Sequence, residues 1–330
     1  MVLGGVNQFI YFLALPVWMT DVVVAIGGNA ILRPGEEATA ENQLNNLRQY
    51  CTPLARMARR GWDLIVVHGN GPQVGNILLQ NELAHSKVPA MPLDVCGAQS
   101  QGQIGLMLQQ AMGEALRREG VDRKVTCLLT RVIVDLDDPE FASPSKPIGP
   151  YYDWPEAERH MALGWRMRED VARGGWRRLV PSPRPRSVLE KDAVRALMAT
   201  GDQIVIAAGG GGVPVVERDG RLLGVEAVVD KDWAASVLAR DLCDLLIILT
   251  DVDAAYVDFG GPRQRALGEV TVDELRSYHA EGNFHSGSMG PKVEAAIAFV
   301  DSPGKAAIIT SPELLDKALE SKAGTRIVLR

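Results

Sequence analysis

The sequence predicts an α/β fold: an open, mainly parallel three-layer α/β/α sheet with a small protruding lid subdomain. Runs of β-branched and aliphatic residues recur without polar alternation, as in strands that are buried on both faces. Several runs end in a glycine-rich turn that leads into a helical pattern. The chain has 330 residues, 46% of them hydrophobic, which suits one large domain or two lobes.

Composition excludes several classes of protein. The net charge is -6 and no long basic run is present, so we expect no nucleic-acid partner. The four cysteines are far apart and form no CxxC pair, which argues against a zinc site or a disulfide framework and fits a reducing cytoplasm. The apolar residues 9–15 are too few to span a bilayer, so we expect no membrane association.

Residues 1–20 form an apolar extension without the basic region of a signal peptide. Two explanations remain open: an extra packed segment, or a start codon assigned too early, with Met19 as the true start. We favour the second. Mass spectrometry of the native N-terminus tests it, and a terminus at Met1 or Val2 would contradict it.

The first two predicted strands, residues 22–26 and 64–67, each end in a glycine turn that carries an asparagine. A helix over residues 41–60, capped by Gly61, separates them. Such turns lie at one edge of a parallel sheet, where their N–H groups can approach an anion. A plain tight turn is the alternative for each, and His68 fits either a ligand contact or a structural role.

The middle of the chain is less regular. We expect a helix from Gln99 to about Glu119, whose glutamines form a polar cap or a site wall, and then a strand over residues 125–134. Prolines make residues 137–152 a stiff, non-helical loop that holds Lys146. The charged, tryptophan-rich residues 153–178 read as a helical excursion, which suggests a lid.

Charged residues gather where a strand meets a helix in the second half. A strand over residues 204–208 precedes four glycines, and a hairpin over 214–221 follows. An apolar run from Gly224 then leads into Asp230, Lys231 and Asp232 at a helix start. The lysine can meet a phosphate oxygen and an aspartate can hold Mg²⁺ or orient the lysine. A solvated helix N-terminus is the alternative.

The last third repeats the alternation of strand and helix. A strand over 245–249 ends near Asp251, a helix covers 271–279, and two strands are expected at 306–309 and 327–329. Serines and glycines precede a helix whose first turn carries Lys292, and helix N-termini attract phosphate.

These features favour phosphoryl transfer, which needs positioning and positive charge rather than a nucleophile. Three lysines stand in constrained contexts, Lys146, Lys231 and Lys292. The chain lacks GxGxxG, GxxxxGK[ST], HExxH and a nucleophile elbow, which disfavours a dinucleotide-dependent dehydrogenase and the corresponding hydrolases.

Taken together, these motifs resemble the carbamate kinases of the amino acid kinase superfamily, over about residues 21–330 and in family order. The matching stretches are residues 25–30, 68–75, 146–150, 175–183, 209–212, 230–232, 250–253 and 287–293. Ala25 stands where many acyl-phosphorylating relatives carry a lysine, and carbamate kinases share this lack and place a cation in the loop of Lys146. Ser145 and Tyr151 are mild departures from the family pattern, whereas the N-terminal extension is a marked one.

The resemblance implies the amino acid kinase fold and the reaction ATP + carbamate ⇌ ADP + carbamoyl phosphate, with Mg²⁺, in a cytoplasmic homodimer. It also implies ATP synthesis during arginine breakdown by the deiminase pathway. Residues 21–330 would form the kinase domain. A carbamate lobe (about 21–222) would include the lid (about 138–180), and a nucleotide lobe (about 223–330) would follow.

The resemblance also implies roles for individual residues. The carbamoyl and transferred phosphoryl groups would lie among Gly27, Gly28, Asn29, Gly69, Asn70 and Gly71. Lys146 and Lys231 would stabilise the charge that develops in transfer, and Asp230 or Asp232 would orient lysines or hold the metal, with the choice left open. The nucleotide would be bound by Gly209, Gly210, Gly211, Gly212, Asp251, Met289, Gly290 and Lys292.

Two other functions stay open from sequence. A relative of the same fold could make carbamoyl phosphate from bicarbonate, ammonia and ATP, which would consume two ATP per product rather than one. A nucleotide-sensing regulator would bind ATP without phosphoryl transfer, although the complete set of lysines argues against it.

Overall fold

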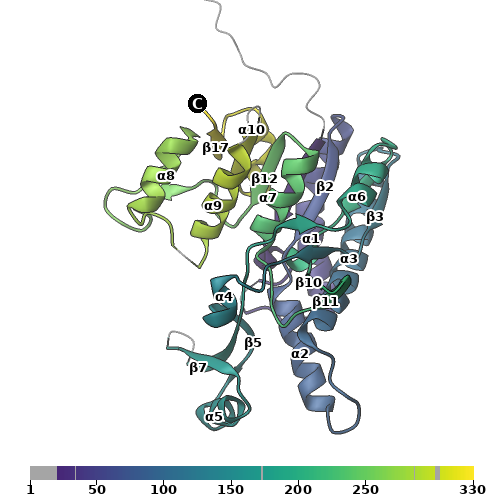
Figure 1. Cartoon of the computed structure of the whole chain (residues 1–330). Coiled ribbons are helices and arrows are strands. Elements are labelled where there is room, and N and C mark those ends of the chain that lie inside the picture. The colour runs from purple at the N-terminus through teal and green to yellow at the C-terminus, as the bar shows by residue number, and fades with distance from the viewer. Residues whose placement is uncertain (1–20, 34, 172–173, 286, 302–304) are drawn as a thin grey trace, which may run out of the picture.

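The structure is a computed structural model that describes residues 21–33, 35–171, 174–285, 287–301 and 305–330. An eight-stranded sheet forms the centre of this part of the chain (Figure 1). The extension over residues 1–20, and both explanations for it, lie outside the described residues. All neighbouring strands run parallel except β16 and β17. The strand order is β15 (Glu269–Thr271), β17 (Thr325–Val328), β16 (Ala306–Thr310), β12 (Leu245–Leu249), β1 (Asp21–Ile26), β2 (Asp63–His68), β9 (Gln203–Ile206) and β3 (Lys124–Cys127).

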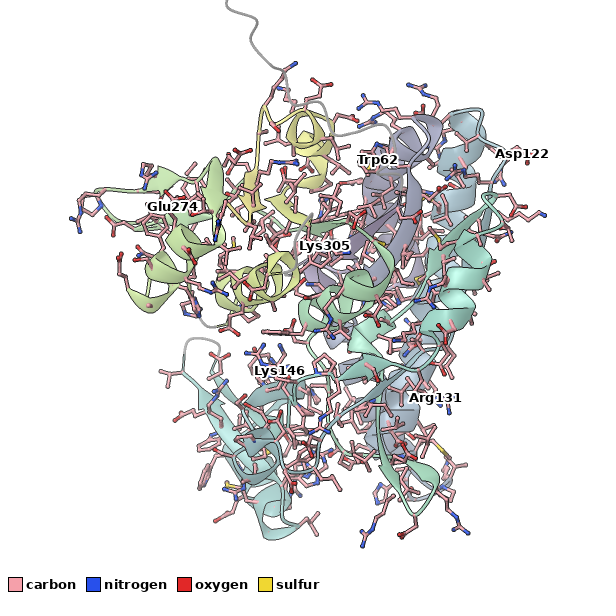
Figure 2. All side chains as sticks on the ribbon, turned by 45° about the horizontal axis from the view of Figure 1, so that its top comes forward. Trp62, Asp122, Arg131, Lys146, Glu274 and Lys305 are labelled. Atoms are coloured by element: carbon pink, nitrogen blue, oxygen red, sulfur yellow. The ribbon has the colours of Figure 1, made fainter. Side chains whose placement is uncertain are left out.

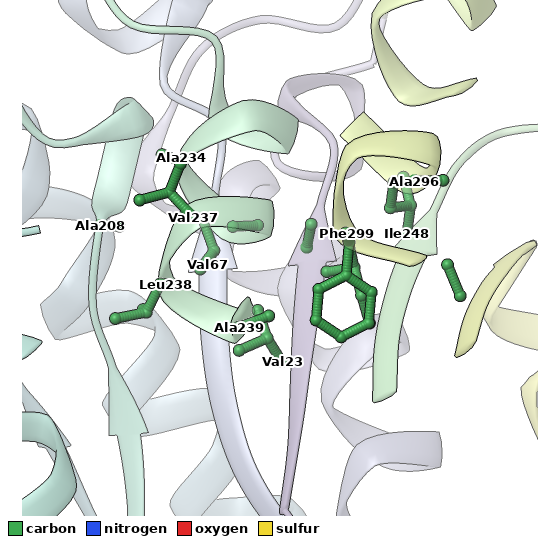
Figure 3. Packing of buried hydrophobic residues seen from close by; sticks show 14 of the residues in the cluster. Val23, Val67, Ala208, Ala234, Val237, Leu238, Ala239, Ile248, Ala296 and Phe299 are labelled. Atoms are coloured by element: carbon green, nitrogen blue, oxygen red, sulfur yellow. The ribbon is translucent and has the colours of Figure 1, made fainter. Parts of the chain in front are cut away.

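Helices cover both faces of this sheet, which confirms the predicted three-layer, mainly parallel fold. One apolar cluster joins the sheet to α1 (Ala40–Arg59), α3 (Leu93–Arg118) and α10 (Leu315–Leu319). The opposite cluster includes α6 (Lys191–Met198), α7 (Lys231–Leu242), α8 (Val272–Ala280) and α9 (Met289–Val300). Figure 3 shows Phe299 of α9 and Leu238 of α7 packed against Val23 and Ile248 of the sheet. Strands buried on both faces explain the unbroken apolar runs in the sequence.

The single strand predicted over residues 125–134 is two strands, because the chain changes sheets there. β3 belongs to the large sheet, whereas β4 (Arg131–Ile133) joins a four-stranded sheet with β8 (Ser187–Val188), β10 (Val213–Arg218) and β11 (Arg221–Gly224). Thr130 lies at the change of sheet. Its backbone N–H donates to the side-chain oxygen of buried Gln101 (2.8 Å), and its carbonyl accepts from the Gln101 amide nitrogen (3.0 Å).

The glutamines of residues 99–103, expected as a polar cap or a site wall, do not cap a helix. α3 begins at Leu93, six residues before the predicted start, so the glutamines lie inside the helix. Helix α2 (Gly71–Ala84) precedes it. The predicted strand before Asp230 is also wrong, because residues 225–230 adopt no strand, although α7 starts at Lys231 as expected.

The lid is mainly β structure, which corrects the predicted loop and helical excursion. After the short helix α4 (Pro139–Ala142), the antiparallel strands β5 (Lys146–Tyr152), β6 (Arg166–Asp170) and β7 (Gly175–Val180) form a sheet in the order β5-β7-β6. Among the described residues of the excursion, those of helix α5 (Trp154–Ala162) are helical as predicted. Two prolines fit into β5 because it is an edge strand.

The remaining elements are short. β13 (Tyr256–Val257) and β14 (Arg265–Ala266) form a hairpin. The described residues also include the 3-10 helices η1 (Gly28–Ala30), η2 (Gly209–Gly211) and η3 (Pro312–Leu314). β12 pairs directly with β1, so the predicted carbamate and nucleotide lobes share one sheet, and their boundary stays a prediction. No described helix is long and apolar enough to cross a membrane.

Candidate active site

A cavity of about 310 Å³ lies at the carboxyl ends of β1, β2 and β9, on the side where the lid meets the sheet. The N-termini of α2, α7 and α9 also reach it, and helix N-termini favour anions. Its lining consists of Gly28, Gly69, Asn70, Gly71, Pro72, Val74, Lys146, Pro147, Ile148, Gly210, Val228, Val229, Asp230, Lys231, Asp232, Gly287, Ser288, Pro291 and Lys292.

The turns after β1 and β2 pack backbone against backbone. A Cβ atom on Gly69 would lie 2.9 Å from the backbone nitrogen of Gly28, so no larger residue fits without a shift of the chain. The Gly69 N–H donates to the carbonyl of Ile26 (2.9 Å), which ties the two turns together. Parallel pairing of β1 with β2 places both turns at one sheet edge, as predicted. The backbone of Asn29 lies in η1, beside Gly28.

The glycines after β9 fill the space between the β2 turn and α7. Gly210 has a φ of +64°, and a Cβ there would lie 2.2 Å from the side-chain nitrogen of Asn70. A Cβ on Gly211 would lie 2.1 Å from the carbonyl oxygen of Val229. Gly210 lines the cavity, whereas Gly209, Gly211 and Gly212 pack behind it.

His68 has a structural place at the end of β2. Its side chain is fully buried, and Nδ1 lies 2.9 Å from the carbonyl oxygen of Gly69, to which the neutral ring donates. A Cβ on Gly209 would lie 2.3 Å from Nε2 of His68. Burial lowers the pKa of His68 to about 4, although the hydrogen bond to Gly69 opposes this. The ring therefore stays neutral near pH 7 and supports two glycine turns.

The three predicted lysines meet at two aspartates. Asp232, 2% exposed, accepts from Lys231 (2.6 Å) and Lys292 (3.1 Å), one on each carboxylate oxygen. Asp230 accepts from Lys146 (3.0 Å) on one oxygen and from the backbone N–H of Asp232 (2.9 Å) on the other, as an N-cap. Lys146 comes from the lid, at the place where the lid faces the rest of the molecule (Figure 2).

Charge and burial oppose each other in this cluster. Burial disfavours the charged form of Asp230, but Lys146 and Lys231 outweigh it and hold the pKa at about 2. Burial lowers the pKa of Lys231 despite Asp232, and the neighbouring ammonium of Lys292 adds to the effect. Burial also disfavours the Lys292 ammonium, but Asp232 outweighs it and the pKa is raised.

The structure brings ten of the predicted site residues to the cavity, and they are Gly28, Gly69, Asn70, Gly71, Lys146, Gly210, Asp230, Lys231, Asp232 and Lys292. Outside its lining lie Gly27, Gly209, Gly211, Gly212, Asp251, Met289 and Gly290. The predicted role of Asn29 falls on a side chain outside the described part of the structure. Met289 and Gly290 begin α9 between the lining residues Ser288 and Pro291, and Asp251 is exposed after β12. The sequence predicted no site role for lining residues such as Pro72, Ile148 and Ser288, although each lies inside one of the stretches that it singles out.

The cavity carboxylates are already engaged in hydrogen bonds, which decides whether they fit a Mg²⁺ ion. Both oxygens of Asp230 and both oxygens of Asp232 already accept hydrogen bonds from lysines or from a backbone N–H. No cluster of three or more His, Cys, Asp or Glu side chains among the described residues could hold a metal. These aspartates therefore do not fit a Mg²⁺ ion held by the protein alone, although Mg²⁺ often reaches an active site on substrate phosphates.

Known proteins are similar to this chain both in sequence and in fold. The profile of the Amino acid kinase family matches residues 21–311. The chain is 48% identical to carbamate kinase of Thermococcus kodakarensis, over 94% of this chain and 99% of that protein. It is 46% identical to carbamate kinase of Clostridium perfringens, over 93% of this chain and 99% of that protein. The solved structure of carbamate kinase from Giardia lamblia bound to AMP-PNP superposes with a TM-score of 0.89 at 40% identity, covering 94% and 99% of the two chains.

Proposed function

The chain belongs to the amino acid kinase family and, within it, to the carbamate kinases, and we propose that it catalyses ATP + carbamate ⇌ ADP + carbamoyl phosphate. A carbamate oxygen forms a bond to the γ-phosphorus while the bond from that phosphorus to the bridging oxygen of ADP breaks. The observation that carries the proposal is the convergence of three lysines and three helix N-termini on one cavity lined by glycine turns. Such a site supplies positive charge where the transferred group spreads its negative charge.

The residues of the site have different roles, which depend on their positions in the cavity. Gly28 and Gly71 offer backbone N–H groups to the carbamoyl and phosphoryl groups, with Gly27, Asn29, Gly69 and Asn70 around them. Lys146 and Lys231 stabilise the charge of the transferred group from the lid and from α7. Lys292, at the first turn of α9, faces the nucleotide phosphates. The nucleotide extends beyond the cavity toward Met289, Gly290 and Asp251, with Gly210 in the cavity wall and Gly209, Gly211 and Gly212 packed behind it.

We propose that Asp230 and Asp232 orient lysines rather than hold Mg²⁺. Each of their oxygens already accepts a hydrogen bond, and removal of either carboxylate would leave neighbouring ammonium groups facing one another. The expected requirement for Mg²⁺ then comes from the nucleotide phosphates, which the ion neutralises when it is bound.

The test is ATP formation from ADP and carbamoyl phosphate, with and without Mg²⁺, beside a Lys146→Ala control. Mg²⁺-dependent ATP formation that the control lacks supports the proposal. Absence of ATP from folded protein would contradict it and would favour the nucleotide-sensing regulator. In the reverse direction, two ATP consumed per carbamoyl phosphate would favour the biosynthetic relative instead of a kinase, which consumes one.

A homodimer is part of this proposal, and an exposed apolar stripe supports it. Val95 and Leu106 lie three turns apart on one face of α3 and are 36% and 58% exposed. A second copy of the chain would cover this face. Leu106→Glu should convert the dimer to monomer in sedimentation, whereas a wild-type chain that sediments as a monomer would contradict the dimer.

We also propose that the enzyme makes ATP during arginine breakdown in the cytoplasm. The four cysteines, all present as free thiols, fit a reducing compartment. The pathway itself rests on the family resemblance. Deletion of the gene should abolish arginine-dependent growth under fermentative conditions, and unchanged growth would contradict this role.

A further inference from the structure

The lid contacts the rest of the molecule at a second place, remote from the lysine cluster. The Tyr152 hydroxyl, at the end of β5, donates to one carboxylate oxygen of Glu82 on α2 (2.9 Å). The Nε2 atom of His160, on α5, lies 3.0 Å from the other oxygen of Glu82. We call these three residues the lid latch. We call the described residues outside the lid the body. One carboxylate on the body, that of Glu82, therefore binds two lid elements.

Aromatic packing fixes the lid side of this latch. The His160 ring stacks on Trp165 at 4.2 Å with an interplanar angle of 8°, and the Tyr152 ring meets His160 edge-on at 4.7 Å. The guanidinium of Arg178 lies 4.3 Å from the centre of the Trp165 ring and forms an ion pair with the Glu226 carboxylate at 2.8 Å. Because Tyr152 is 7% exposed, its hydroxyl needs the partner that Glu82 supplies.

Strand β5 and helix α2 connect the latch to the active-site cavity. β5 has Lys146 at one end and Tyr152 at the other, and α2 has Gly71 at the cavity and Glu82 in its last turn. Between these ends the two backbones touch, since a Cβ on Gly75 would lie 3.4 Å from Cα of Gly149. A seven-residue strand spans about 20 Å, so the latch acts on Lys146 at a distance.

Other contacts hold β5 less firmly in this region. Its pairing with β7 is irregular between Ile148 and Tyr152, so the ladder alone does not fix the far end of the strand. A cavity of about 360 Å³ separates the lid from α2 beside the latch, with Leu78, Leu93, Ile148 and Leu163 in its walls. An apolar cluster packs the start of β5 and the end of β7 against α2 and α3, and its members are Val74, Ile77, Leu93, Cys96, Ile148 and Val180. The polar contacts to Glu82 hold the far end of β5, beyond this cluster.

We infer that Glu82 is a positioning residue for Lys146: by binding Tyr152 and His160 it holds β5 along α2 and thereby places the lid lysine at the active-site cavity. The inference rests on the proposed function for its kinetic consequence, because Lys146 is a catalytic residue in that proposal. Glu82 itself lies outside the lining of the active-site cavity.

A double-mutant cycle between Glu82 and Lys146 tests the inference. Glu82→Ala and Tyr152→Phe should each lower kcat by about 10- to 100-fold, the loss typical of a misplaced catalytic group. Glu82→Gln keeps an acceptor for Tyr152 and should retain more activity than Glu82→Ala. The matched control is Glu158→Ala, which removes an exposed carboxylate of α5 and should leave kcat unchanged.

The decisive comparison is made in the Lys146→Ala background. If Glu82 acts through Lys146, then Glu82→Ala should lower the residual rate of Lys146→Ala less than about twofold, whereas a general loss of structure would lower both backgrounds equally. Equal losses in both backgrounds, or full activity of Glu82→Ala and Tyr152→Phe, would overturn the inference.

Hydrogen exchange separates this inference from the proposed function. Amides of β5 should exchange faster in Glu82→Ala than in wild type or Glu158→Ala, while amides of β1 and β2 should not change. A wild-type protein that forms no ATP would refute the proposed function. Unchanged exchange in β5 would refute the latch whether or not the wild type is active.

Discussion

The central sheet and the lid hold their active-site residues by different means. Residues 22–26 of β1 and 64–67 of β2 are fully buried between two layers of helices, so apolar packing fixes the glycine turns that follow them. Among the described lid residues, the buried apolar side chains are Ile148, Tyr152, Ala157 and Val180, of which Ile148 and Val180 pack against α2 and α3. Lys146 itself is partly exposed and is held by its ion pair with Asp230 at the start of an edge strand. The comparison implies that the body supplies a fixed anion site and the lid an adjustable cation.

The largest effect should follow from Lys231→Ala, which alters the fixed half of the site. Turnover should fall by about 10²–10³-fold through loss of one stabilising charge. The free energy of unfolding should also fall, by about 1–3 kcal/mol, because Asp232 stays buried with one ammonium partner fewer. ATP-formation kinetics and urea unfolding measure the two losses. Normal turnover in a folded variant would remove Lys231 from the mechanism.

Lys146→Ala should separate activity from stability. Turnover should again fall by about 10²–10³-fold, but the free energy of unfolding should change by less than about 1 kcal/mol, because the Lys146 side chain is 42% exposed. The same two measurements apply. If this variant lost as much stability as Lys231→Ala, the contrast between fixed body and adjustable lid would fail.

The lowered pKa of His68, a residue of the central sheet, should make the free energy of unfolding depend on pH. Because the pKa of His68 is lowered from 6.5 to about 4 by burial, its contribution to stability is complete above pH 6.5 and is lost as the pH falls toward 4. The loss should reach about 3 kcal/mol. His68→Gln should flatten this part of the urea-unfolding profile. An unchanged slope in the variant would show that another group is responsible.

The smallest effect should come from Trp154→Ala, at the lid surface. Trp154 is 51% exposed and its ring lies 5.0 Å from that of Trp176, so its loss should cost about 1 kcal/mol. Urea unfolding measures the change, with Phe299→Ala as the core comparison at about 3–5 kcal/mol. Similar losses in the two variants would mean that the lid is packed as firmly as the sheet.

The central strands could be predicted from sequence because full burial on both faces leaves an unbroken apolar pattern. The lid could not, since Pro147 and Pro150 suggest a loop and become acceptable in a strand only when β7 pairs with one edge of β5. The change of sheet at Thr130 was also hidden, because the side chain of Gln101 takes the place of a neighbouring strand. These are long-range contacts with no local pattern.

The residues of the active site also differ in how far the sequence could predict them. The glycine turns and the three lysines are local motifs, and the sequence marked them. The pairing of Lys146 with Asp230, 84 residues away, depends on how the lid folds over the sheet. The choice between Asp230 and Asp232 as metal ligand or lysine partner required the hydrogen bonds themselves. Residue spacing likewise could not tell that Gly211 packs behind the cavity while Gly210 lines it.

The shared aspartates have a practical consequence for work with this enzyme. Three lysines and two aspartates line the described cavity, which leaves one surplus positive charge before any substrate arrives. A cavity of that charge, with helix N-termini around it, accepts whichever small oxyanion is abundant. Phosphate and sulfate buffers should therefore raise the apparent KM for carbamoyl phosphate, and chloride should do so far less. Affinities are best determined in zwitterionic buffers.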